Sequence, residues 1–299
     1  MGSSWNKGLA THQPVQFEGI EQLFARIISA AIRGVLVALL IATPSLLLPA
    51  YATHSAEMVA LLGLLAAVLT FAEYSSTFPS FVEFRDAPPL NRLRFTALFA
   101  MLVPLSLIAK HPFDPSNLTA FFSALGHLVG NMLDFPYSPV RLIVLMLPEN
   151  APLQTINTAR AAAGISYLLG LSTIAIFLFT VRVLDWPVGN GPFNFWVNLP
   201  LFDPTTGGDI VHRLQRDGRI NVILGSLLPF LIPAVVKLAK DFYAPTLFND
   251  PHTLIWTMSA WSFLPASMIM RGVAMLRIAD MIEEKRKRTY ASAEVVQTA

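Results

Sequence analysis

The sequence contains no cysteine. This absence excludes disulfide bonds, thiolate chemistry, iron–sulfur clusters and cysteine-ligated zinc sites. Charged residues are also scarce: they make up 13% of the 299 residues, against roughly 25% in an ordinary soluble domain. The motifs HExxH, GxSxG and GxGxxG and the Walker lysine are missing. We therefore expect no catalytic residue, no metal site and no cofactor, and the absence of these motifs argues against an enzyme without excluding one.

Hydrophobic residues, in contrast, account for 54% of the chain and gather in long runs. The runs 58–72 and 164–181 contain no charged residue. A transmembrane helix needs roughly 20 apolar residues. We therefore expect an all-α fold, a polytopic integral membrane bundle of about six transmembrane helices. The expected spans are 34–52, 58–78, 93–109, 161–181, 220–239 and 254–276.

Two shorter apolar pieces, 118–133 and 140–147, lie between the third and fourth spans. Each piece is too short to cross the bilayer comfortably. We expect them to form either a re-entrant hairpin or two interfacial helices. Either arrangement makes 110–160 an insertion on the outer face of the membrane.

The distribution of lysine and arginine predicts the orientation, because cytoplasmic loops retain an excess of both. With six spans, fifteen of these residues fall on one side and four on the other. The four are Lys110, Arg141, Arg160 and Lys240. We expect both termini to face the cytoplasm, most simply at a bacterial inner membrane. The small net charge of +2 gives no sign of nucleic-acid binding.

The expected organisation has three parts. A cytoplasmic N-terminal segment, 1–33, carries an amphipathic interfacial helix, because its apolar residues recur at helical spacing. The transmembrane domain, 34–276, includes the outer insertion and a cytoplasmic loop, 182–219, that begins a second amphipathic helix. A basic cytoplasmic tail, 277–299, completes the chain.

Prolines occur in four of the six expected spans. They are Pro44, Pro104, Pro229, Pro233 and Pro265. A proline inside a helix frees a carbonyl group, which in lipid needs another partner. Broken helices of this kind build substrate and ion sites in transporters, but prolines also produce simple kinks.

Three charged residues lie within spans or at their edges, where an ionisable group suggests function. Glu73 either belongs to a site or pairs as a latch with an arginine of the following loop. Lys237 can reach the interface. Arg271 has no acidic neighbour on its own helix closer than Asp280. We expect Arg271 to extend to the cytoplasmic interface rather than pair across helices.

The short apolar piece 118–133 and the residue after it hold the most suggestive polar residues. His127, Asn131 and Asp134 are spaced by four and three residues, so a helix would place them on one face. They form either a structural polar stripe or a transport or proton-relay face. Gly126 and Gly130 make a small-xxx-small pattern that permits close helix packing. On the cytoplasmic loop we expect aromatic interface anchors at Phe193, Phe195 and Trp196.

The sequence favours a non-catalytic membrane subunit of a multi-protein inner-membrane assembly, such as a secretion or conjugation machine or an energy-transducing complex. Its expected partners are the lipid bilayer and other membrane subunits. One alternative is a small transporter or channel with broken helices. Another is a membrane enzyme acting on lipid, with Glu73, Glu83 and Asp86 as the acid–base group.

Overall fold

The computed structural model describes residues 15–49, 56–187, 194–202, 207–238 and 250–298. Within these ranges it contains eight helices of at least eight residues and one short helix. The helices are α1 (Val15–Leu47), α2 (Ala56–Ser75), α3 (Leu90–Lys110), α4 (Asn117–Leu133), α5 (Pro139–Met146), α6 (Leu153–Arg182), α7 (Phe195–Asn198), α8 (Ile210–Leu238) and α9 (Pro251–Thr298). The predicted all-α class is confirmed.

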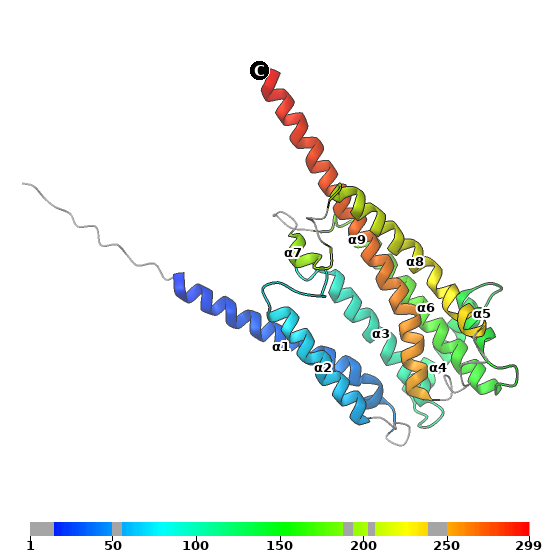
Figure 1. The fold of residues 1–299 in the computed structure, drawn as a ribbon. Coiled ribbons are helices and arrows are strands. Elements are labelled where there is room, and N and C mark those ends of the chain that lie inside the picture. The colour runs from blue at the N-terminus through cyan, green and yellow to red at the C-terminus, as the bar shows by residue number, and fades with distance from the viewer. Residues whose placement is uncertain (1–14, 50–55, 188–193, 203–206, 239–249, 299) are drawn as a thin grey trace, which may run out of the picture.

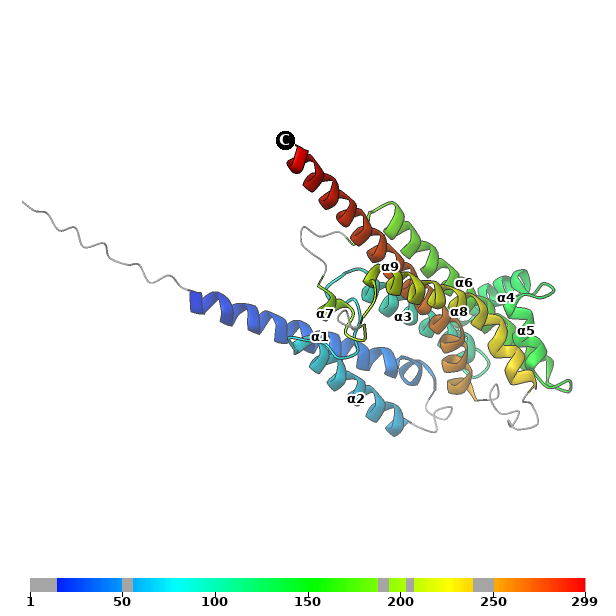
Figure 2. The same cartoon turned by 45° about the horizontal axis from the view of Figure 1, so that its top comes forward.

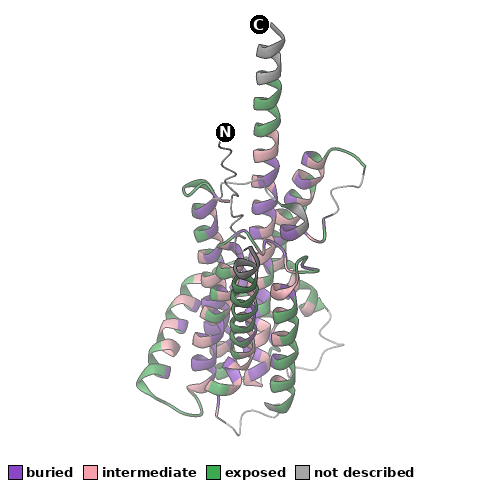
Figure 3. Cartoon of the chain, turned by 90° about the vertical axis from the view of Figure 1, so that its left-hand side faces the viewer, coloured by how far each residue is buried: buried purple, intermediate pink, exposed green. Residues whose placement is uncertain are grey.

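Six of these helices, α1, α2, α3, α6, α8 and α9, are long and apolar enough to span a membrane. About half of each most apolar window is buried in α3, α6 and α9, but less than a fifth in α1, α2 and α8. The outer helices expose large apolar side chains such as Leu61 and Leu231 (Figure 3). Water would penalise so large an apolar surface, whereas lipid tails solvate it. The chain is a polytopic integral membrane protein.

The helices α3, α6 and α9 form the centre of the bundle, and α8 packs along α9 on its outside (Figure 1). The pair α1 and α2 forms a hairpin that joins the bundle mainly through contacts of α1 with α3. The second view shows the same hairpin to one side of the other spans (Figure 2). The hairpin therefore has more of its surface open to lipid than the central helices.

One end of the bundle is closed by an apolar cluster built partly from loops. Phe84 of the α2–α3 loop and Trp186 of the α6–α7 loop are fully buried there, against residues of α3, α6, α8 and α9. The indole N–H of Trp186 donates to the carbonyl of Pro88 at 2.9 Å. The C-terminus lies beyond this same end, and α1 begins on that side (Figures 1 and 3).

Three expected boundaries fall inside continuous helices. The predicted interfacial helix before residue 34 and the first span are both part of α1. Gly34 does not break α1, because it serves helix packing: a Cβ atom there would lie 2.8 Å from the Ala67 carbonyl oxygen of α2. Likewise α8 begins at Ile210 and includes the second amphipathic stretch, and α9 continues past residue 276 into the tail.

The two short apolar pieces form α4 and α5. Ser116 and Thr119 form a capping box that begins α4, and Ser138 caps α5 with Pro139 in the first turn. The end of α4 packs against the start of α6, and its own first turn lies beside the end of α3. Both short helices therefore lie near one end of the bundle, opposite the loop cluster (Figure 1).

Candidate functional site

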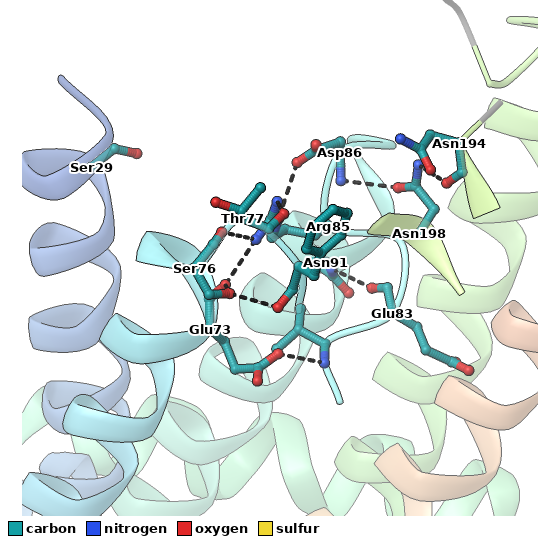
Figure 4. A network of polar contacts seen from close by, with 12 residues as sticks. Ser29, Glu73, Ser76, Thr77, Glu83, Arg85, Asp86, Asn91, Asn194 and Asn198 are labelled. Carbon is teal, nitrogen blue, oxygen red and sulfur yellow. Dashed lines mark hydrogen bonds and ion pairs between the residues drawn. The ribbon is translucent and has the colours of Figure 1, made fainter. Parts of the chain in front are cut away.

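A network of polar contacts surrounds the end of α2 and the α2–α3 loop and reaches Asn198 of α7 (Figure 4). An ion pair of Glu83 extends it to α9. The buried carboxylate of Glu73 accepts hydrogen bonds from the backbone N–H groups of Ser80, Phe81 and Val82, at 2.9 to 3.2 Å. A carboxylate surrounded by backbone donors fixes a loop firmly. Glu73 thus acts as a latch, but it holds backbone N–H groups rather than an arginine side chain.

Arg85 completes this latch from the other side. Its guanidinium donates to the carbonyl oxygens of Glu73 at 2.9 Å, Ser76 at 2.8 Å and Thr77 at 3.3 Å. These carbonyls lie at or just beyond the C-terminal end of α2, where the helix leaves acceptors without internal partners. A cation is also favoured there by the helix dipole.

Arg271 of α9 forms a two-pronged ion pair with Glu83 of the α2–α3 loop. Nε lies 2.5 Å from Oε2, and Nη2 lies 2.7 Å from Oε1. The expectation that Arg271 extends alone to the interface was therefore wrong. The half-buried guanidinium of Arg271 lies in an apolar helix that offers no carboxylate nearby, and the fold brings Glu83 to it from a distant loop. The only sequence signal was the arginine itself within an apolar helix.

Arg94 of α3 lies near the same pair and interacts electrostatically with both of its members. Its terminal nitrogens donate to Asn91 Oδ1 at 3.4 Å and to the Ser267 carbonyl at 3.3 Å. Its Nε is buried and has no partner within the described residues. Glu83 therefore contacts Arg271 directly and interacts with Arg94 only through its charge. Sequence reasoning considered Arg94 only as a partner for Glu73.

The three carboxylates considered for acid–base chemistry are now placed. Glu73 holds loop backbone, and Glu83 holds Arg271. Asp86 is 61% exposed and lies 3.3 Å from Arg85 Nε. Glu73 and Glu83 are therefore engaged in structural contacts, whereas Asp86 is exposed. This arrangement suits a rigid joint between α2, α3 and α9.

The polar residues of α4 divide between two environments. The carboxylate of Asp134 lies 2.8 Å from Arg160 Nε and 3.3 Å from Arg141 Nη1. Its side chain is nearly buried, at 8% exposed, whereas His127 and Asn131 are exposed. Asp134 therefore ties α4 to α5 and α6, while His127 and Asn131 remain accessible.

His127 lines a polar pocket of about 480 Å³ between the end of α3, α4 and the start of α6. His111, Gln154 and Asn157 also line it. His111 Nδ1 lies 3.1 Å from Thr119 Oγ1 of α4. The described lining combines these polar groups with apolar surface from Ile108, Pro112 and Pro115 and contains no carboxylate, lysine or arginine, so it suits a small molecule with polar groups or water better than a strongly charged ion.

The close packing predicted from Gly126 and Gly130 is confirmed. A Cβ atom at Gly130 would lie 2.7 Å from the Arg160 carbonyl oxygen. A Cβ atom at Gly164 of α6 would lie 2.5 Å from the Cα atom of Gly130. Gly130 of α4 and Gly164 of α6 therefore let the backbones of the two helices come into contact.

None of the five prolines interrupts its helix: α1, α3, α8 and α9 continue through them. Pro233 frees the carbonyl of Pro229, four residues earlier. The indole N–H of Trp261 on α9 donates to that carbonyl at 3.1 Å. A neighbouring helix thus supplies the lost hydrogen bond, as a structural proline in lipid requires.

The remaining candidates lie at the ends of helices or outside the described residues. Lys237 is exposed in the last turn of α8. Phe193 lies outside the described residues. Phe195 and Trp196 belong to α7, but their side chains also lie outside the description. The prediction that these aromatic residues anchor the interface therefore stays a prediction.

Within the described ranges, no group of three or more histidine, aspartate or glutamate side chains is placed to hold a metal ion. Comparisons with protein families, with curated proteins and with solved structures find no match to this chain.

Proposed function

We propose that this chain is a non-catalytic membrane subunit of a multi-protein assembly in a bacterial inner membrane. The observation that carries the proposal is the length of α9. Its 48 residues correspond to roughly 72 Å of helix, more than twice the ~30 Å hydrocarbon core. The last turns of α9 extend beyond the loop-covered end of the bundle (Figure 1). We name this projection the α9 extension (residues 283–298). Packing against a partner subunit would explain why α9 continues beyond the bundle.

The described surface of the α9 extension suits a partner. Its charged side chains pair within the helix, Lys287 with Glu283 at 2.8 Å and Arg288 with Glu284 at 3.7 Å. Tyr290 is 73% exposed. Such pairs add only a few tenths of a kcal/mol each, and a helix without tertiary packing is marginal in water. Packing against another protein would stabilise it.

One contact fixes the base of the extension to the bundle. Arg286 Nη1 donates to Asp209 Oδ1 at 2.7 Å, just before α8 begins. This hydrogen bond, aided by the N–H of Val211, lowers the pKa of the Asp209 carboxyl below its usual value. The pair therefore remains charged at neutral pH and weakens only when acid protonates Asp209.

The proposed orientation places the α9 extension in the cytoplasm. The end that carries the α2–α3 loop and the α9 extension also carries Arg92, Arg182 and Arg219, whereas Lys110 and Arg160 lie towards the other end. Positively charged loops are retained in the cytoplasm. In this assignment 1–33, 182–219 and 277–299 are cytoplasmic, and 110–160 is the outer insertion.

Gentle detergent extraction tests the proposal. We expect the full chain to migrate as a complex with other proteins, and a chain ending at Ile282 to lose them while remaining folded. A photo-crosslinking residue at Tyr290 should capture a defined partner, whereas the same residue at exposed Leu62 of α2 should not. A full-length chain that is a stable monomer, with no crosslink at Tyr290, would contradict the proposal.

The polar pocket beside His127 favours a second candidate, a small transporter or channel. Its volume of about 480 Å³ accommodates a small polar solute. In liposomes, transport by this route should fall in a His127→Ala variant and in an Asp134→Asn variant, which loosens the α4 attachment. Transport that is unchanged by both substitutions would contradict a transport role for this pocket.

A further inference from the structure

A second pocket lies on the lipid-facing side of the polar network, between α1, the end of α2 and the α2–α3 loop. It has a volume of about 290 Å³. We call it the arginine pocket, and its polar lining consists of Arg26, Ser29, Arg33, Tyr74, Arg85 and Asp86. Three guanidinium groups and one carboxylate give it a formal excess of two positive charges. Such an excess favours an anionic ligand.

The α1 residues of the pocket lie on one helical face. Arg26, Ser29 and Arg33 are spaced by three and four residues, which places them one above another. Ser29 projects from α1 towards the loop that carries Arg85 (Figure 4). The other faces of this stretch expose Phe24 and Ile28, at 60% and 57%. The basic groups therefore form a polar stripe on an otherwise apolar helix.

The two α1 arginines are held without a carboxylate partner in the described residues. The guanidinium carbon of Arg33 lies 4.4 Å from the ring centre of Tyr74, and its Nε lies 3.4 Å from Ser29 Oγ. The Nη2 of Arg26 is buried and has no hydrogen-bond partner among the described residues. An unpaired buried guanidinium nitrogen is costly unless a ligand accepts its hydrogen bond.

The depth of the pocket fits a lipid phosphate. Counted from Leu47 at the opposite end of α1, Arg33 and Arg26 lie roughly 21 and 32 Å along the helix. The hydrocarbon core is about 30 Å thick, so the pocket lies where acyl chains give way to headgroups. Towards the bilayer centre α1 exposes Val35, Leu36 and Leu39, an apolar strip beside which acyl chains can lie.

We propose that the arginine pocket binds the phosphate group of an anionic phospholipid. Guanidinium groups bind phosphate oxygens through paired charge-assisted hydrogen bonds, and the hydroxyl groups of Ser29 and Tyr74 can donate to the same oxygens. Basic pockets between transmembrane helices recognise lipid headgroups in this way. The bound lipid attaches the α1–α2 hairpin, which has few protein contacts, to the rest of the bundle. This inference does not depend on the proposed function.

The test uses the full-length protein in a neutral detergent. Phosphatidylglycerol, phosphatidylcholine and inorganic phosphate are titrated separately, and binding is followed by thermal unfolding and native mass spectrometry. The wild-type chain should bind phosphatidylglycerol in preference to the other two. In the double variant Arg26→Gln, Arg33→Gln, the affinity for phosphatidylglycerol should fall about tenfold or more, because charge-assisted hydrogen bonds are lost. The matched control, Arg92→Gln with Arg219→Gln, removes two exposed charges from the same end and should retain wild-type affinity.

The single variant Arg26→Gln keeps the test informative if the double variant folds poorly. Because Arg26 Nη2 has no described partner, this substitution should leave the lipid-free protein as stable as wild type and still weaken phosphatidylglycerol binding. Equal binding by the pocket and control variants would overturn the site. Inorganic phosphate that binds as tightly as phosphatidylglycerol, or phosphatidylcholine that does so, would overturn the assignment to an anionic lipid.

Discussion

At the scale of single residues, the charged side chains of this membrane domain mainly hold one segment of the chain to another. Glu73 and Arg85 fold the α2–α3 loop back onto the end of α2. Glu83 and Arg271 then tie that loop to α9. Glu73 and Glu83 are buried and Arg85 is largely so, so water competes little for these contacts and a few residues can determine how helices meet.

Removing either member of the Glu83–Arg271 pair should destabilise the protein, but not equally. Glu83→Gln leaves two guanidinium groups, those of Arg271 and Arg94, without a carboxylate. We expect it to lower the free energy of unfolding by about 3 kcal/mol, and Arg271→Gln by about 2 kcal/mol, because breaking a buried pair strands a charge. Denaturant unfolding in detergent micelles measures both. Exposed Glu57→Gln is the control, and a Glu83→Gln effect no larger than this control would refute the prediction.

The indole of Trp261 should contribute to stability because Pro233 leaves the Pro229 carbonyl without a helical N–H donor. Trp261→Phe leaves the Pro229 carbonyl without its donor, at a cost of about 1 to 3 kcal/mol. In a Pro233→Ala background the backbone N–H returns, so the same substitution should cost less. A double-mutant cycle by thermal unfolding measures this coupling. Trp256→Phe controls for the smaller ring, and zero coupling would show that the hydrogen bond is unimportant.

At the scale of helices, close glycine contacts organise the packing. The helices α4 and α6 meet at Gly130 and Gly164, and α8 and α9 meet where a Cβ atom at Gly272 would lie 2.6 Å from the Gly218 carbonyl oxygen. Lipid tails are as apolar as leucine, so helices in a membrane gain little from burying large apolar side chains. Small residues instead bring the backbones together and increase van der Waals contact.

Substitutions of two helical glycines should have opposite effects. Gly164→Ala places a methyl group against the Gly130 backbone, and overpacking of this kind costs about 1 to 3 kcal/mol. Gly63→Ala meets nothing closer than 3.5 Å, so the higher helix propensity of alanine should stabilise α2 by up to about 1 kcal/mol. Thermal unfolding compares the two variants. Equal melting temperatures would mean that the α4–α6 contact is looser than described.

At the scale of the whole molecule, an even number of spans places both ends of the chain on one side of the bilayer. The α9 extension, the α2–α3 loop and the start of α1 share one end of the bundle, and the α4–α5 connection lies at the other (Figure 1). In the orientation that we propose from the charge asymmetry, the first end faces the cytoplasm. Partner binding at the extension and lipid binding at the arginine pocket would take place on the same side.

Cysteine labelling tests this arrangement cleanly because the chain has no cysteine of its own. Tyr137→Cys, at a position 88% exposed between α4 and α5, should react with a membrane-impermeant maleimide on intact cells. Ala291→Cys should react only after the membrane is opened. Ser138 is unsuitable because its side chain is buried and caps α5. Labelling of Ala291→Cys on intact cells would invert the topology and with it the proposed cytoplasmic roles.

The sequence alone determined that the chain is helical, that it enters the membrane and which six segments are long and apolar enough to cross it, because hydrophobic length is a local property. It did not determine where the helices containing these segments begin and end. It also predicted the close approach at Gly130. Only the tertiary structure decided that Arg271 forms an ion pair with Glu83, that Asp134 forms one with Arg160 and that Trp261 donates a hydrogen bond to the Pro229 carbonyl. Each of these contacts joins residues far apart in the chain, and a partner of this kind is fixed by helix packing rather than by local spacing.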